Sequence, residues 1–322
     1  MVIPKKYEKY EQTVSVACVN FSTTWGDKKA NLEKIKTNVK QAAEQGNNII
    51  VFPELALSGY ECDEDSTERV GLCAMHEKAA ETIPGPSTQE IAKIAKELQV
   101  YVVMGMPEQD KTVPKSRYIS AAVIGPEGIL GAYRKVHLLP PPIGTEPSCF
   151  RPGTELPVFE TKYGPIGVLI CLEFYIYPEL ARILALKGAR LILNVTASPS
   201  GPAKAQFIVQ QTGARATENL VYCASANLVG KEINKSFYGH SCITGPLFPR
   251  LNFIFAEGGD VEEIVSATLS FEKLHYWDEI MPWKQLRQGK LISDEFINLL
   301  YRLSKNHFCR RPITDYRLPP TP

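Results

Sequence analysis

The sequence lacks an apolar run long enough to span a bilayer, and its N-terminus has no apolar segment of the kind found in signal peptides. It has no Cys-x-x-Cys pair, and its five histidines show no metal-ligand spacing. Neither sign of charge dominates, because 36 basic residues are balanced by 35 acidic ones. We therefore expect a cytoplasmic protein that binds neither nucleic acid nor membrane and has no histidine-ligated metal.

The chain also lacks internal repeats, low-complexity tracts and a long linker rich in Pro, Ser or Gly. Its 322 residues, 44% of them hydrophobic, can bury a sizeable core in one large domain. We place this domain at residues 13–274, between an N-terminal extension (1–12) and a C-terminal extension (275–322). An even cysteine count is compatible with disulfides in a secreted protein, but reduced thiols fit a large chain without a signal peptide better. The eight cysteines are Cys18, Cys62, Cys73, Cys149, Cys171, Cys223, Cys242 and Cys309.

Strand and helix patterns alternate along the chain, which is typical of an α/β protein. Several predicted strands are continuous apolar runs, so helices should cover the sheet faces. A hairpin expected around residues 126–128 argues against a simple doubly wound sheet and favours two stacked sheets. Strands are predicted at 14–21, 48–52, 100–106, 119–124, 129–135, 166–170, 190–195 and 221–226, with others near 241, 252 and 264. Helices are predicted at 28–45, 87–98, 178–187 and 203–218.

Three chemically reactive side chains each lie at or just after the end of a predicted strand. Cys171 ends the run 165–170 and precedes a helix start marked by Pro178, so a sharp turn should expose its sulfur. Glu54 follows the strand 48–52, and Lys135 ends the strand that begins at 129. Because open sheets build their sites at the carboxyl ends of strands, we expect these groups to meet.

The segments around these residues resemble the nitrilase, or carbon–nitrogen hydrolase, family, in its amidase-like branch. The similarity covers roughly residues 13–269, and its motifs occur in the family's order. It implies an αββα sandwich, with two stacked mixed sheets and outer helices, and a Glu-Lys-Cys triad of Glu54, Lys135 and Cys171. The matching segments are Phe52-Pro53-Glu54, Tyr133-Arg134-Lys135, Gly167-Val168-Leu169-Ile170-Cys171, Glu146 ahead of Pro152-Gly153, and Gly239-His240-Ser241.

The resemblance assigns each group a role in cleaving a C–N bond. Glu54 is the general base for the Cys171 thiol and returns a proton to the leaving amine, which requires a pKa raised toward neutrality. Lys135 and the backbone N–H of Leu172 stabilise the developing anion. Glu146 orients Lys135 and accepts a hydrogen bond from the substrate nitrogen. A Cys171 thioester is then hydrolysed by a water that Glu54 activates, and the cycle that the resemblance implies needs no metal and no organic cofactor.

Most of these residues also have a purely structural interpretation. Lys135 could form a surface pair with Arg134, and Glu146 could be exposed in its proline-rich loop. Glu173 fits equally a residue supporting the site and an acid at a helix start. We interpret Cys149 as incidental and His137 as structural.

The chain departs from the family pattern after the nucleophile. Glu173 replaces an aspartate that is common in amidases, and Leu172 replaces the tryptophan of true nitrilases. No arginine lies between Cys171 and Leu180 to hold a substrate carboxylate. Aromatic side chains there could form a pocket wall or a subunit interface. The predicted pocket residues are Tyr60, Phe174, Tyr175 and Thr196.

The leading functional hypothesis is hydrolysis of a small amide or N-carbamoyl compound with release of ammonia. A nitrilase using the same residues is the first alternative, and a non-catalytic binding protein is the second. A papain-like peptidase fits poorly, because the signature expected around its cysteine is absent. The C-terminal extension, aromatic at 276–283 and basic at 308–322, is expected to pack on a neighbouring subunit of a homodimer or larger even-numbered assembly.

Overall fold

Two six-stranded mixed sheets form the centre of the protein. The computed structural model describes residues 3–62, 73–141 and 143–305. The first sheet has the order β14-β1-β2-β3-β4-β5, and the second has the order β13-β12-β9-β8-β7-β6. Their strands are β1 (Thr13–Asn20), β2 (Ile49–Val51), β3 (Tyr101–Gln109), β4 (Arg117–Gly125), β5 (Gly128–Arg134), β14 (Glu263–Ser270), β6 (Val158–Phe159), β7 (Ile166–Ile170), β8 (Leu191–Thr196), β9 (Tyr222–Asn227), β12 (Cys242–Leu247) and β13 (Arg250–Glu257). A separate ribbon joins β10 (Val229–Lys231) and β11 (Ser236–Tyr238).

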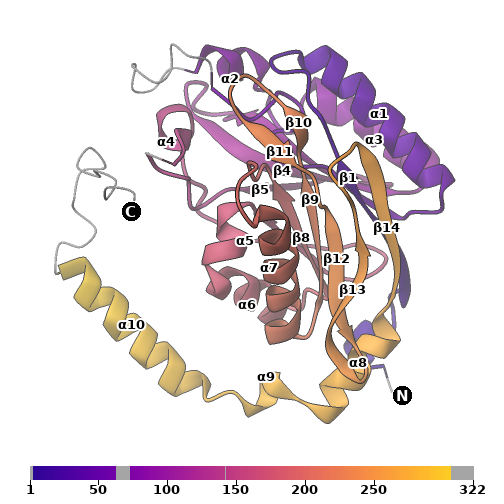
Figure 1. Ribbon diagram of the computed structural model, residues 1–322. Coiled ribbons are helices and arrows are strands. Elements are labelled where there is room, and N and C mark those ends of the chain that lie inside the picture. The colour runs from indigo at the N-terminus through magenta and orange to yellow at the C-terminus, as the bar shows by residue number, and fades with distance from the viewer. Residues whose placement is uncertain (1–2, 63–72, 142, 306–322) are drawn as a thin grey trace.

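Helices cover the outer face of each sheet (Figure 1). On the first sheet these are α1 (Lys28–Glu44) and α3 (Pro86–Leu98), and on the second they are α5 (Leu172–Ile176), α6 (Pro178–Leu186) and α7 (Lys204–Asn219). The remaining helical segments are η1 (Lys5–Tyr7), α2 (Ala74–Ala79), α4 (Glu146–Cys149), α8 (Phe271–Ile280), α9 (Trp283–Leu286) and α10 (Gly289–Lys305). This arrangement confirms the αββα sandwich predicted from the sequence.

The central strands are parallel and apolar, as expected for a sheet that is covered on both faces. β2 pairs in parallel with β1 and β3, and β8 pairs in parallel with β7 and β9. All residues of β2, β7, β8 and β9 are buried. The carboxyl ends of β2 and β7 are therefore held in place by the core, and they position Glu54 and Cys171, which follow these strands.

The C-terminal segment has more structure than its composition predicts. The domain boundary expected at residue 274 falls inside α8, whose His275 and Trp277 are buried. α9 contacts the body through Trp283, which lies under the guanidinium of Arg182 at 4.3 Å. Beyond it, α10 extends away from the rest of the molecule (Figure 1). In the part of the chain that the structure describes, no helix combines the length and apolar character that crossing a membrane demands.

Candidate active site

Cys171 occupies a strained turn between β7 and α5. Its backbone angles are φ 54° and ψ −112°, a region that residues with side chains seldom adopt. The turn is held by the Cys171 N–H, which donates to the carbonyl oxygen of Val195 and to Oδ1 of Asn194, each at 3.0 Å. Leu172 begins α5, where the first N–H groups of a helix lack intrahelical acceptors. The turn therefore places a thiol beside a backbone donor at the sheet edge.

Glu54 lies in the turn that follows β2, fully buried. Leu55 adopts a left-handed conformation with φ 52°, which turns the chain at this point. The backbone of the turn passes directly over Gly105 in β3, where a Cβ atom would lie 2.1 Å from the carbonyl oxygen of Pro53. Only glycine allows this approach, so Gly105 helps to set the position of the Glu54 carboxylate.

Lys135 follows β5, and its side chain is completely buried between two carboxylates. Its Nζ lies 2.7 Å from Oε1 of Glu54 and 2.7 Å from Oε1 of Glu146. Glu146 is the first residue of the short helix α4 and is buried rather than exposed. Its Oε2 accepts from the Leu139 N–H at 2.7 Å, and its Oε1 accepts from the Tyr60 hydroxyl at 2.9 Å. The surface-pair interpretation of Lys135 and the exposed-loop interpretation of Glu146 are therefore wrong.

Burial and charge set the protonation of the catalytic candidates. Burial, opposed by the charge of Lys135 and assisted by that of Glu146, raises the pKa of Glu54 to about 7. Burial and the charge of Glu54 raise the pKa of the Cys171 thiol to about 12. Burial alone would lower the pKa of Lys135, but the charges of Glu146 and Glu54 outweigh it and raise that pKa above its ordinary value. At neutral pH the sulfur therefore carries its proton, and Glu54, whose charge acts on the Cys171 thiol, can exchange one.

Glu173 connects the Lys135 segment to the Cys171 turn. Its Oε1 accepts from the N–H groups of Val136 and His137 at 2.8 and 2.9 Å, and its Oε2 accepts from the Tyr133 hydroxyl at 2.8 Å. Both oxygens therefore bind residues that flank Lys135, while Glu173 itself lies in α5, the helix that follows Cys171. Glu173 thus fixes the Lys135 segment relative to the Cys171 turn. The ring of His137 stacks on Tyr177 with centroids 3.9 Å apart, in agreement with a structural role.

A cavity of about 210 Å³ is lined in part by Cys171. Its walls include the predicted residues Leu172, Tyr60 and Tyr175 and also two lysines, Lys204 and Lys235. A second cavity, of about 470 Å³, shares Tyr60, Ile143 and Lys235 with the first and reaches Glu146.

Two of the predicted pocket residues lie outside this wall. Phe174 and Thr196 are fully buried and are not among the residues that line either cavity. The Phe174 side chain belongs to the core, where its ring packs edge-on against Tyr175. Thr196 supports the wall from behind, because its hydroxyl lies 3.2 Å from that of Tyr175. The prediction that these two side chains form the pocket surface is therefore wrong.

Comparison with known proteins places this arrangement in a family. The family profile described as carbon-nitrogen hydrolase matches residues 15–279. The chain belongs to the carbon–nitrogen hydrolase family. It is therefore an enzyme of the nitrilase superfamily, and the amidase-named relatives of this family support amide C–N hydrolysis as its reaction type.

Individual relatives of this carbon–nitrogen hydrolase include proteins named as nitrilases and as amidases. The chain is 37% identical to the probable nitrilase C965.09 of Schizosaccharomyces pombe over 72% of its length and 80% of that protein. It is 33% identical to the omega-amidase NIT2 of Xenopus tropicalis over 83% of its length and 93% of that protein. The crystal structure of Saccharomyces cerevisiae Nit3, a member of branch 10 of the nitrilase superfamily, superposes with a TM-score of 0.73 and 27% identity, covering 88% of this chain and 98% of Nit3.

Two features of the site region are missed by the sequence patterns. Lys204 is the first residue of α7, and Lys235 immediately precedes β11. Neither belongs to a motif, and nothing local marks them as cavity residues. Cys149 is predicted to be incidental, but its Sγ lies 3.0 Å from that of Cys62, beside Cys73 and His76. The spacing Cys73-x-x-His76 is the one sequence feature that could have indicated this cluster. The expectation that no histidine has metal-ligand spacing is therefore wrong for His76.

Proposed function

We propose that the enzyme hydrolyses a small primary amide to an acid and ammonia, or an N-carbamoyl compound to CO2, an amine and ammonia, through a thioester on Cys171. The observation that carries the proposal is the buried Glu54–Lys135–Glu146 cluster, with Lys135 Nζ 2.7 Å from both carboxylates and the Cys171 thiol close enough for the charge of Glu54 to raise its pKa. A carboxyl group with a pKa of about 7 can both accept and return a proton at neutral pH, as a general acid–base catalyst must.

The first half-reaction forms the thioester. Glu54 takes the thiol proton as the Cys171 sulfur attacks the substrate carbonyl carbon, and a C–S bond forms. The carbonyl oxygen becomes negative and is stabilised by the Lys135 ammonium and the Leu172 N–H. When the tetrahedral intermediate collapses, the C–N bond breaks, and Glu54 gives its proton to the leaving nitrogen while Glu146 accepts a hydrogen bond from it.

The second half-reaction restores the enzyme. Glu54 removes a proton from a water that attacks the thioester carbonyl, and Lys135 and Leu172 again stabilise the oxyanion. The C–S bond then breaks, the acid leaves, and the proton held by Glu54 returns to the sulfur. One water is consumed and one ammonia released in each cycle.

The cavity also bears on the class of substrate. A space of about 210 Å³ suits a short acyl group, and its wall is largely apolar near Cys171. Lys204 and Lys235 give the same wall two cationic side chains. A substrate with a carboxylate a few bonds from its amide would find an ionic partner there, in place of the arginine absent between Cys171 and Leu180.

An ammonia-release screen tests the proposal. It should include aliphatic amides, N-carbamoyl compounds, matched nitriles, and neutral and anionic versions of each acyl chain. We expect amides or carbamoyl compounds to be consumed and the matching nitriles to be ignored, with Cys171→Ala inactive. Cys223→Ala, which removes a buried thiol from β9, serves as the control and should remain active. Turnover of nitriles alone, or full activity of Cys171→Ala, would overturn the proposal.

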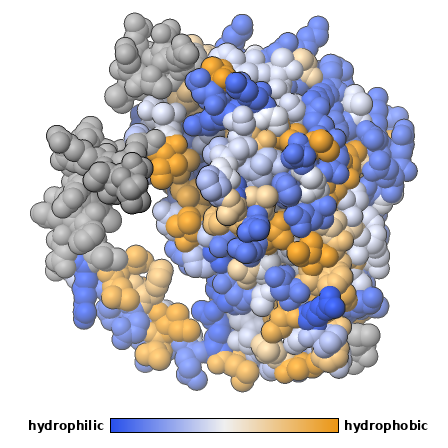
Figure 2. Space-filling model, viewed as in Figure 1, coloured by the Kyte–Doolittle hydropathy of each residue, from blue (hydrophilic) through white to orange (hydrophobic). Residues whose placement is uncertain are grey.

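We also propose that the C-terminal extension packs on a second copy of the chain. Ile292, Phe296, Leu299 and Leu300 recur at helical spacing in α10 and are all exposed, and Figure 2 shows apolar side chains gathered along this helix. An isolated helix of 17 residues is marginally stable in water, so α10 requires a surface to cover it. Light scattering should report a dimer or larger even assembly, and Phe296→Glu should weaken it; an unchanged monomer in both proteins would contradict the proposal.

A further inference from the structure

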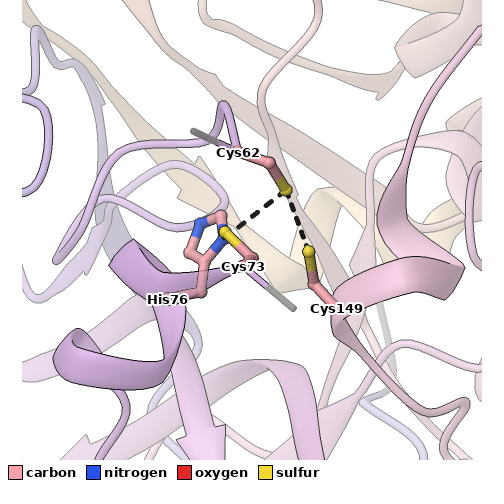
Figure 3. Close-up of side chains that lie close together, drawn as sticks. All are labelled: Cys62, Cys73, His76 and Cys149. Carbon is pink, nitrogen blue, oxygen red and sulfur yellow. Dashed lines mark hydrogen bonds between the residues drawn. The ribbon is translucent and has the colours of Figure 1, made fainter. Parts of the chain in front are cut away.

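Three cysteines and one histidine converge beside the active site. The four ligand atoms, Sγ of Cys62, Cys73 and Cys149 and one ring nitrogen of His76, all lie within 4.8 Å of one another. Sγ of Cys62 is 3.0 Å from that of Cys149, and Nδ1 of His76 is 2.9 Å from Sγ of Cys73 and 3.8 Å from that of Cys62. Figure 3 shows the three thiols and the imidazole pointing toward a common centre.

We infer that these four residues form a structural zinc site. Zinc bound by sulfur and nitrogen is tetrahedral, with Zn–S bonds of about 2.3 Å and Zn–N bonds of about 2.0 Å, which puts the ligand atoms roughly 3.5–3.8 Å apart. The distances in this cluster lie on both sides of that value, so shifts of about an ångström would complete the geometry. Three cysteines and one histidine fill all four positions, as in closed structural sites rather than catalytic ones.

The orientation of His76 is already that of a metal ligand. Its Nε2 lies 3.0 Å from the carbonyl oxygen of Gly59, and because a carbonyl can only accept, Nε2 must carry the ring proton. Nδ1 therefore presents a lone pair to the three sulfurs. A histidine ligand that donates its other N–H to a backbone carbonyl is the usual arrangement around zinc, since the second hydrogen bond fixes the tautomer and the ring.

Other contacts around the four ligands also favour metal binding. The His76 ring packs against Phe150 with centroids 5.0 Å apart, and the Thr145 hydroxyl donates toward Sγ of Cys62 at 3.6 Å. Such a donor stabilises a thiolate. His76 and Cys73 are fully buried and Cys149 nearly so, while Cys62 is partly exposed and lines the second cavity.

The principal competitor is a disulfide between Cys62 and Cys149, whose sulfurs are close. A disulfide would use two of the four groups and would leave unexplained why Cys73 and a correctly oriented His76 point at the same centre. Zinc uses all four. Binding one Zn²⁺ releases three thiol protons and leaves a centre of net charge −1, so affinity should increase with pH.

The site would join three separate segments close to the catalytic cluster. Cys62 follows Tyr60, Cys73 and His76 belong to the start of α2, and Cys149 ends α4. α4 begins at Glu146, whose carboxylate accepts a hydrogen bond from the Tyr60 hydroxyl. Zinc would thus fix the two chain segments that carry Glu146 and its hydrogen-bond donor, which makes the four ligands positioning residues for the cavity wall.

Metal analysis of the full chain tests the inference independently of any activity. Protein purified under reducing conditions without chelator should contain about one zinc per chain by elemental mass spectrometry. Replacement by Co²⁺ should give thiolate charge-transfer absorption and the visible bands of tetrahedral cobalt. Cys62→Ala and His76→Ala should lose the metal, while Cys223→Ala, the matched cysteine control, should retain it.

Alkylation supplies a second measurement that does not depend on how the variants fold. In the wild-type protein, bound zinc should protect Cys62 and Cys149 from iodoacetamide, and removal of the metal should expose both and lower the melting temperature. The inference is overturned by reduced wild-type protein that takes up no zinc or cobalt, by metal that persists in the ligand variants, or by a native Cys62–Cys149 disulfide whose reduction restores no metal binding.

Discussion

Replacing Lys135 with methionine is the most informative single perturbation of the candidate active site. Methionine matches the lysine side chain as far as its ε-carbon but lacks the ammonium group, whose Nζ lies 2.7 Å from Glu54 and 2.7 Å from Glu146. All three side chains are buried, so water cannot replace the lost charge. Because Lys135 lowers the pKa of Glu54 and Glu146 raises it, the Glu54 pKa should rise above its wild-type value of about 7.

The expected effects on stability and rate are both large. Breaking a buried ion pair by removing one partner costs about 3–5 kcal/mol in the free energy of unfolding. The raised pKa of Glu54 also makes this loss depend on pH. Between the ordinary pKa of a glutamate and the raised pKa of Glu54, the folded variant binds more protons than the unfolded variant, so its free energy of unfolding falls as pH rises. The loss should be larger at about pH 8.5 than at about pH 6. Removing one donor to the oxyanion should lower kcat by roughly 10²–10³.

Chemical denaturation at the two pH values and steady-state ammonia release measure these effects. Lys162→Met is the matched control, because its ammonium is half-exposed and lies 3.3 Å from the exposed Glu11. An exposed pair contributes about 0–1 kcal/mol, and this variant should keep its kcat. A Lys135→Met enzyme with wild-type kcat and only a higher KM would refute the reasoning, because Lys135 would then bind the ground state alone.

Three further predictions concern the groups around Lys135. Because burial raises the pKa of Glu54 to about 7, kcat/KM should fall as pH drops below about 7, and an acid limb near the ordinary glutamate value would contradict its role as base. Gly105→Ala places a Cβ 2.1 Å from the Pro53 carbonyl oxygen and should cost roughly tenfold to 10²-fold in kcat by displacing Glu54. In the control Gly259→Ala, the new Cβ meets only Glu263 at 3.6 Å and kcat should not change; equal kinetics of the two variants would count against the packing argument. Glu173→Gln places an amide N–H next to the donors that the carboxylate accepts from, which are the N–H groups of Val136 and His137 and the Tyr133 hydroxyl. In a denaturation experiment it should lower the free energy of unfolding by about 1–3 kcal/mol. An unchanged value would show that these contacts contribute little.

Residues that follow strands were the most predictable part of the site. Glu54 and Cys171 each follow a run whose apolar character predicts a buried strand, and open sheets build their sites at the carboxyl ends of such strands. Lys135 follows β5, an edge strand of mostly half-buried residues, so its strand-end position and the family resemblance pointed to it rather than a buried run. The alternation of helical and strand patterns gave the layered fold for the same reason, because periodicity reports which face is buried. The family resemblance then supplied roles that periodicity does not contain.

Residues on short or irregular segments could not be placed in this way. Glu146 begins a helix of only four residues in a proline-rich stretch, where no periodic pattern exists, so nothing in the sequence shows that it is buried. The cysteine–histidine cluster was missed because its ligands come from separate segments, with Cys62 and Cys149 separated by 87 positions. Cys309, which we expect to be a reduced thiol like the other cysteines, lies outside the described residues. Phe174 was misplaced because an aromatic side chain fits a core and a pocket wall equally well.

The covalent state of Cys171 during turnover tests the central claim most directly. The wild-type enzyme, mixed with an amide identified in the ammonia screen and quenched in acid, should be analysed by intact mass and peptide mapping. The account predicts a mass increase equal to the acyl group on the peptide that contains Cys171, and no increase in Cys171→Ala. Sustained turnover with an unmodified Cys171, or an acyl group on a different cysteine, would contradict it.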